Sequence, residues 1–99
     1  MNIRELQKDV SLLIAKVDSQ SNTQHDADTT LVHLLEELGE LSTQIYNHKT
    51  GREVVNRELL ESGFCDCIVM LLQLASNYDV DVEKAIQTKL VKIKQRFNI

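Results

Sequence analysis

Proline is absent from this chain, and glycine is rare, with three residues; the aromatic side chains are two tyrosines and two phenylalanines. Turn-rich and strand-rich proteins need more of these residues, whereas helices tolerate their absence. The composition therefore predicts an all-α fold. Because 99 residues supply one modest core, we expect a single domain, residues 1–99, that gains stability by associating with copies of itself.

Cysteine and positive charge are also scarce. Cys65 and Cys67 are the only cysteines, and on a helix two positions apart their side chains would point about 200° away from each other. A disulfide between them is therefore not expected, and no second pair of ligands stands at a spacing typical of zinc sites. The formal net charge of -4 argues against a broad positive surface, so we expect no DNA binding.

Long apolar runs, which are typical of membrane proteins, are also missing from the sequence. The sequence shows no uninterrupted apolar stretch of the roughly 18 residues that span a bilayer. Residues 1–18 also lack the layout of a signal peptide. We therefore expect a soluble cytoplasmic protein without a membrane partner.

Apolar residues recur at helical spacing in four segments. The predicted helices cover residues 2–18, 29–48, about 53–78 and 82–97. The polar segment before the second helix predicts a loop that ends in a cap at Asp28 or Thr29, and Asp81 is the predicted cap of the last helix. A short glycine-containing connection at 49–52 favours antiparallel packing of the second and third helices. The expected architecture is a four-helix bundle.

Three carboxylates lie within little more than one turn of the second predicted helix. Glu37 and Glu40 share a sector with His33 and Gln44 at the edge of the leucine stripe, and Glu36 lies farther toward solvent. Like charges at this spacing repel each other unless a cation offsets them. The string indicates either a cation site or a solvated acidic face.

Asp66 stands in an otherwise apolar run, Gly63–Leu72. A buried carboxylate needs a partner, a proton or a metal ion, and no side chain one turn away along the helix is charged. Antiparallel packing would bring Glu37 and Glu40 opposite Asp66. Oxygen ligands of this kind suit Mg²⁺ or Mn²⁺, which recruit substrate phosphates. The alternative is that Asp66 lies at a solvent-facing edge of its helix.

With these residues in place, the chain from Leu31 to Phe97 resembles the MazG-like all-α nucleoside triphosphate pyrophosphohydrolases. Their pattern is Glu-Glu-x-x-Glu on one helix and Glu-x-x-Asp on the next. The matching parts are Leu-Glu-Glu-Leu-Gly-Glu-Leu at 35–41, Asp66 with its apolar helix, the junction at 78–81 and the basic segment 89–97. The resemblance implies Mg²⁺-dependent hydrolysis of a nucleoside triphosphate to the monophosphate and pyrophosphate, in a dimer or tetramer. It also implies a role in cleansing the nucleotide pool.

The resemblance assigns roles to particular carboxylates. Glu37, Glu40 and Asp66 would hold the metal ion, with Mg²⁺ expected and Mn²⁺ as the other suitable ion. Glu36 would be the catalytic residue that supports the metal or orients water. The metal would offset charge that develops at phosphorus and help to generate a hydroxide nucleophile.

Basic residues of the last predicted helix would hold the rest of the triphosphate. They are Lys89, Lys92 and Arg96, at spacings i, i+3 and i+7. Lysine and arginine bind phosphate oxygens through charge-assisted hydrogen bonds. A purely structural explanation is equally open, since cations near the end of a helix complement its dipole.

Two positions depart from the family pattern. Gly63 stands where the family has the glutamate that precedes Asp66 by three residues, and Ile93 stands where many relatives carry a nucleotide-binding asparagine. Glu61 and Glu58 cannot replace the missing ligand, because they lie on another face or more than two turns away. Glycine inside a helix also indicates a kink or a close approach. We expect weak, altered or absent activity.

Two other classes of function fit parts of the sequence. A helical nucleotide-binding or protein-interaction module that has lost the chemistry is favoured by Gly63 and Ile93. A plain oligomerisation domain explains the apolar stripes but gives no reason for Asp66. If the protein is an enzyme, we expect the first helix and the 18–28 loop to form the pocket for the base. The candidate polar contacts in this loop are Asn22, His25 and Asp26. The alternative for each of them is a solvated loop residue without a role in binding.

Overall fold

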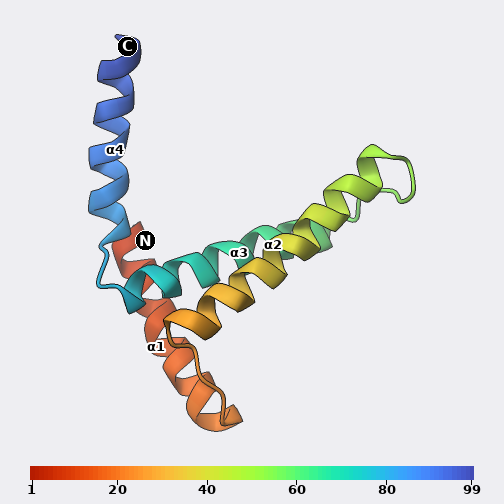
Figure 1. The fold of residues 1–99 in the computed structure, drawn as a ribbon, viewed down its shortest axis with the longest axis horizontal. Coiled ribbons are helices and arrows are strands. Elements are labelled where there is room, and N and C mark those ends of the chain that lie inside the picture. Colours follow the sequence, from red (N-terminus) through yellow and green to blue (C-terminus); the bar gives the residue numbers. More distant parts are fainter.

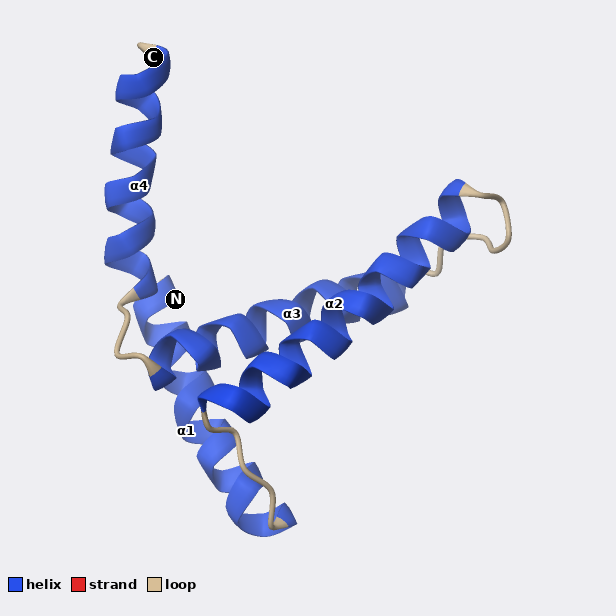
Figure 2. Cartoon of the chain, in the orientation of Figure 1, coloured by secondary structure: helices blue, strands red, loops and turns tan.

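The computed structural model describes residues 1–99 as four helices without strands. These are α1 (Ile3–Ser21), α2 (Ala27–Lys49), α3 (Arg57–Asn77) and α4 (Val82–Phe97), and Figure 2 shows that only short loops join them. The predicted all-α class is confirmed.

Each helix begins at a polar residue whose side chain accepts a hydrogen bond from a backbone N–H three positions on. The four caps are Asn2, Asp26, Asn56 and Asp81. The predicted cap at Asp81 is confirmed, whereas α2 begins earlier than predicted because Asp26, rather than Asp28 or Thr29, caps it. α3 begins at Arg57, later than predicted. A capping side chain satisfies one of the backbone donors that a helix leaves unpaired at its start.

The two middle helices, α2 and α3, form the antiparallel hairpin that the short connection predicted (Figure 1). Gly63 lies buried in their seam, where an added Cβ would stand 3.2 Å from Leu41 Cδ1 and 3.4 Å from Gln44 Nε2. The helix continues through this position without a break. The glycine therefore serves a close approach of two helices and does not mark an interruption.

The core lies where α1 crosses the open end of the hairpin (Figure 1). Its buried apolar residues are Val10, Ile14, Leu34, Leu41, Cys67, Met70 and Leu72. Only 11 of the 99 residues are buried, and the radius of gyration is 16.2 Å, compared with about 13 Å for a compact domain of this length. One chain by itself is therefore extended, with a small core.

The last helix, α4, is tied to the rest of the chain at its first turn. The buried Gln7 amide donates to the Val80 carbonyl over 2.7 Å and its oxygen accepts from the Val82 N–H over 3.1 Å. Arg4 pairs with Asp81 and Glu83, both over 3.0 Å. Beyond this point α4 rises away from the hairpin (Figure 1) and has no buried residue. The helices therefore do not close into a bundle within one chain.

Apolar side chains remain exposed on every helix, and those of α2, α3 and α4 recur at helical spacing. The leucine stripe of α2 is divided, because Leu34 and Leu41 are buried while Leu35 and Leu38 are exposed. The exposed members of these three stripes include Leu31, Leu35 and Leu38 on α2, Phe64, Ile68 and Leu71 on α3, and Ile86, Leu90 and Phe97 on α4. Each set repeats at helical spacing, so each forms a continuous apolar face without a partner in the chain.

One helix, α3, is long and apolar enough, by length and composition, to cross a membrane. This differs from the expectation that no segment reaches that length. Core helices of proteins outside membranes share the property, and α3 packs along α2 and against α1. Its composition is therefore only a weak indication of a membrane segment.

Candidate functional site

Glu37 is the member of the acidic string that the fold encloses most. Its side chain is 17% exposed, and its Oε1 lies 3.2 Å from Nε2 of His33, one turn earlier on α2. Across the seam, burial raises the pKa of the Cys67 thiol, and the negative charges of Glu37 and Asp66 raise it further. Gly63 packs against Leu41 in the antiparallel hairpin, so one turn farther along α3 Cys67 and its neighbour Asp66 lie at the level of Glu37.

Asp66 is exposed in the single chain and takes part in none of its ion pairs. Its immediate neighbour Cys67 is buried in the seam, so Asp66 stands at the edge of the same interface. An apolar helix tolerates an acidic residue at this position because solvent stabilises its charge. Within the chain, Asp66 therefore lies at a solvent-facing edge of its helix, as the alternative prediction stated.

Glu36 and Glu40 lie on the outer side of α2, and both are exposed. They line a shallow depression with other residues of α2, and neither Glu37 nor any residue of α3 contributes to it. Nowhere in the chain do three or more His, Cys, Asp or Glu side chains form a group that would hold a metal ion. The chain therefore does not assemble Glu37, Glu40 and Asp66 into a complete ligand set.

The chemistry of these donors nevertheless suits Mg²⁺. This ion is usually held by one or two carboxylates, several waters and the phosphates of a substrate, so it does not require a complete protein cage. Glu37 uses Oε1 for its hydrogen bond to His33. Glu37 and Asp66 are donors of the kind that Mg²⁺ uses in such shared sites, whereas Glu40 lies on the outer side of α2.

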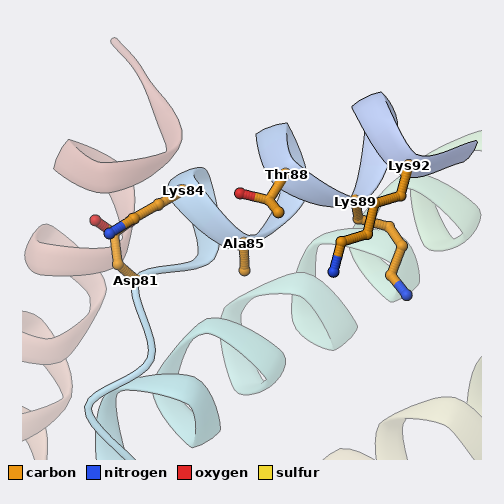
Figure 3. A pocket seen from close by; sticks show the side chains of 6 residues that line it. All are labelled: Asp81, Lys84, Ala85, Thr88, Lys89 and Lys92. Atoms are coloured by element: carbon orange, nitrogen blue, oxygen red, sulfur yellow. The ribbon is translucent and has the colours of Figure 1, made fainter. Parts of the chain in front are cut away.

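Two of the three basic residues predicted to bind phosphate lie together on α4. Lys89 and Lys92 border a shallow depression on α4 with Lys84 and Thr88, and Figure 3 shows the Lys89 and Lys92 side chains extending from the same side of the helix. Arg96 does not line it; its Cζ lies 5.7 Å from the centroid of its neighbour's ring, Phe97. No ion pair joins these cations to the acidic string.

A chain of polar contacts that the sequence analysis did not predict leads to Glu37. Asp18 Oδ1 lies 2.8 Å from His25 Nδ1, and His25 Nε2 lies 2.9 Å from His33 Nδ1. His33 then contacts Glu37. Which ring nitrogens donate and which accept in these three contacts depends on the tautomers of His25 and His33. The spacing of His33 and Glu37 was visible in the sequence, but their link to His25 and Asp18 depends on how α1, α2 and the loop meet.

The loop residues considered for base recognition have structural roles. His25 is half-buried between α1 and α2, Asp26 caps α2, and Asn22 ends α1 with a φ of 53°. Hydrogen bonds from the Thr29 backbone and side chain lower the pKa of Asp26. These residues were expected either to contact a base or to be solvated. His25 is instead partly buried, and its ring contacts Asp18 and His33.

Comparisons with models of protein families, with curated proteins and with solved structures find no match to this chain. The resemblance to the MazG-like enzymes therefore rests on the pattern of residues 31–97 alone. Any assignment of function depends on that pattern and on the geometry around Glu37.

Proposed function

We propose that this protein is a Mg²⁺-dependent nucleoside triphosphate pyrophosphohydrolase of the MazG-like type that works as a homo-oligomer. One observation carries the proposal: Gly63 of α3 packs against Leu41 of α2, so one turn along the antiparallel hairpin the enclosed carboxylate of Glu37 faces the part of α3 that carries Asp66. These are positions at which the family pattern has metal-binding carboxylates.

The carboxylates of the chain have separate tasks in this proposal. Glu37 and Asp66 would hold Mg²⁺ at the edge of the seam, and the family pattern assigns Glu40 as a further donor. When bound, the ion supplies positive charge against the phosphates and acidifies a water molecule. Glu36, exposed beside Glu40, accepts a hydrogen bond from the attacking water and so orients it. The substrate is a nucleoside triphosphate, and the role is removal of unwanted nucleotides.

Self-association is part of the proposal because one chain leaves both its apolar stripes and its charges without partners. The faces of α2, α3 and α4 that carry Leu35, Ile68 and Leu90 are exposed. A second copy that covers them completes a helical bundle, as a dimer or a tetramer. Burial of such faces is the dominant favourable term in protein association.

Charge favours the same arrangement. Glu36 and Glu40 of the acidic string and the lysines on the basic face of α4, Lys89 and Lys92, take part in no ion pair of their own chain. When α4 of one copy packs against the hairpin of another, opposite charges meet, and bound triphosphate lies between carboxylate-held Mg²⁺ and lysine. Arg96 would join them after leaving the ring of Phe97.

The direct test is release of pyrophosphate from a panel of nucleoside triphosphates with Mg²⁺. We expect Asp66→Asn to lower the rate at least about 10-fold, because it removes a charged metal donor. The matched control is Glu61→Gln, which removes a carboxylate from an exposed position of the same helix and leaves the rate unchanged. Wild-type release no greater than that of Asp66→Asn would rule out the enzyme.

A second candidate function is a helical nucleotide-binding or protein-interaction module without catalysis. Gly63 favours it, since the glycine packs against Leu41 where the family pattern has a metal-binding glutamate. Mg²⁺-dependent binding of a nucleotide without turnover would support this module. A plain oligomerisation domain would show neither binding nor turnover.

A further inference from the structure

We infer that His33 is a positioning residue that orients the Glu37 carboxylate for a divalent cation, and that His25 and Asp18 fix the ring of His33. The inference rests on the proposed function, in which Glu37 is a metal ligand. It goes beyond that function because it assigns a role to three residues that the family pattern does not include.

The contact between His33 and Glu37 decides which carboxylate oxygen remains available. Nε2 of His33 lies 3.2 Å from Oε1 of Glu37, within hydrogen-bonding distance. No other hydrogen bond or ion pair of the chain engages this carboxylate. A glutamate on a helix otherwise samples several rotamers, so this single bond restricts the direction in which Oε2 points.

The ring of His33 is itself held at its second nitrogen. Nδ1 of His33 faces Nε2 of His25 over 2.9 Å, and the two ring centroids are 5.2 Å apart with planes inclined by 34°. A rotation of the His33 ring about its χ angles would break both of its contacts. A metal-binding side chain is commonly oriented by such an outer partner, which is oriented in turn by another group.

Asp18 anchors the far end of this chain of contacts. Its Oδ1 accepts from the Thr23 hydroxyl over 2.6 Å and contacts Nδ1 of His25 over 2.8 Å. The Thr23 hydrogen bond, followed by the hydrogen bond and charge of His25, lowers the pKa of Asp18. Asp18 thus holds the Nδ1 edge of the His25 ring at the end of α1.

The backbone of His25 is fixed as well as its ring. Its carbonyl accepts a hydrogen bond from the Asn77 amide over 3.2 Å, and the same amide donates to the Thr30 hydroxyl over 3.3 Å. His25 is therefore connected to α1 through Asp18, to α2 through His33 and to α3 through Asn77. The direction of the Glu37 carboxylate depends on how all three helices meet.

The experiment measures Mn²⁺ binding by electron paramagnetic resonance, without nucleotide. We expect His33→Ala to weaken binding about 10-fold or more, which is the usual effect of losing an outer partner of a metal ligand. His33→Gln retains an N–H donor at this position, so it should recover part of the lost affinity. His48→Ala changes an exposed histidine of the same helix that makes no side-chain hydrogen bond, and it should have no effect.

A double-mutant cycle tests whether His33 acts through Glu37. In a Glu37→Gln background, His33→Ala should cause no further loss of Mn²⁺ affinity, because the carboxylate that it positions is gone. Equal losses in both backgrounds would overturn the inference, as would wild-type binding that His33→Ala leaves unchanged. Thermal unfolding of each variant separates a loss of folding from a loss of positioning, and His33→Gln keeps the test valid if His33→Ala unfolds.

Failure of this inference can be told apart from failure of the proposed function. Pyrophosphate release by the wild type, with Mn²⁺ affinity insensitive to His33→Ala, would overturn the inference and leave the function standing. Absence of turnover, with the cycle behaving as expected, would overturn the function and leave the positioning role. A wild type that neither binds Mn²⁺ nor releases pyrophosphate would overturn both.

Discussion

The junction of α1, α2 and α3 and the helix α4 are held in opposite ways. At the junction, His25 connects three helices through its ring and its carbonyl, and the Thr30 side chain is fully buried. The helix α4 has no buried residue and is tied at its first turn through Gln7 and Arg4. Apolar packing and polar contacts therefore both hold the junction within the chain, whereas α4 leaves its apolar surface exposed.

This difference is a consequence of size and has a functional meaning. A chain of 99 residues supplies little core of its own, so small helical proteins often complete their core by association. In the proposed assembly, the junction holds Glu37 within one chain, and the lysines of α4 reach the carboxylates only from a second copy.

The largest effect on stability is expected from the seam next to the junction. Leu41→Ala removes a buried side chain and should lower the free energy of unfolding by about 2–5 kcal/mol. Leu90→Ala on the exposed face of α4 should act only through association, so its effect should grow with protein concentration. Denaturant titrations at several concentrations check both, and a concentration-independent loss for Leu90→Ala would contradict the comparison.

The next effect concerns assembly. Leu90→Asp places a charge in the apolar stripe of α4 and should weaken self-association at least about 10-fold, since a buried charge without a partner is costly. Gln95→Asp introduces the same charge on another face of this helix and serves as the control. Sedimentation velocity measures the outcome. Equal behaviour of the two variants would show that the stripe does not face a partner.

A smaller effect distinguishes two glycines of the hairpin. Gly39→Ala should stabilise the protein by about 0.5–1 kcal/mol, because nothing lies within 4 Å of the added Cβ and alanine favours a helix. Gly63→Ala brings the new methyl 3.2 Å from Leu41 Cδ1, so repacking should cancel that gain or reverse it. Denaturant unfolding compares the two, and identical gains would show that the seam is looser than the structure indicates.

The smallest expected effect is the loss of thermal stability at low pH. Hydrogen bonds from Thr29 lower the pKa of Asp26, and hydrogen bonds from Lys84 and Arg4 lower that of Asp81, from an ordinary value of 3.8. A lowered pKa in the folded state gives stability that is present above the unfolded value and lost as the pH falls through the folded one. Unfolding temperatures should drop below about pH 4. Asp26→Asn keeps the cap without a titrating group and should flatten that drop, whereas an unchanged slope would contradict the assignment.

Much of the helical framework was predictable from the sequence. The apolar period placed four helices, and the polar residue before the last one, Asp81, identified its start. The start of α2 was misplaced because several capping residues follow one another between Asp26 and Thr29, and only the backbone conformation decides among them. Periodicity also identified the leucines of α2 as a stripe. It does not indicate which of these leucines are buried by other helices of the same chain.

The site was predictable only in part, for a related reason. The acidic string and Asp66 stand out by charge on apolar helices. Glu37 lies at the edge of the core as predicted, whereas Glu40, predicted in the same sector, is exposed on the outer side of α2. The chain from Asp18 through His25 to His33 joins residues of two helices and a loop, so no local pattern contains it. Whether Lys89 and Lys92 meet the acidic string depends on the assembly of copies, which a single sequence does not specify.

The proposed activity is tested most directly by which phosphoanhydride bond of the nucleoside triphosphate is broken. Phosphorus-31 NMR of one nucleoside triphosphate incubated with the protein and Mg²⁺ should show monophosphate and pyrophosphate appearing together in equal amounts, with Asp66→Asn strongly impaired. Formation of diphosphate and orthophosphate, or no change beyond that seen with Asp66→Asn, would contradict the proposed activity.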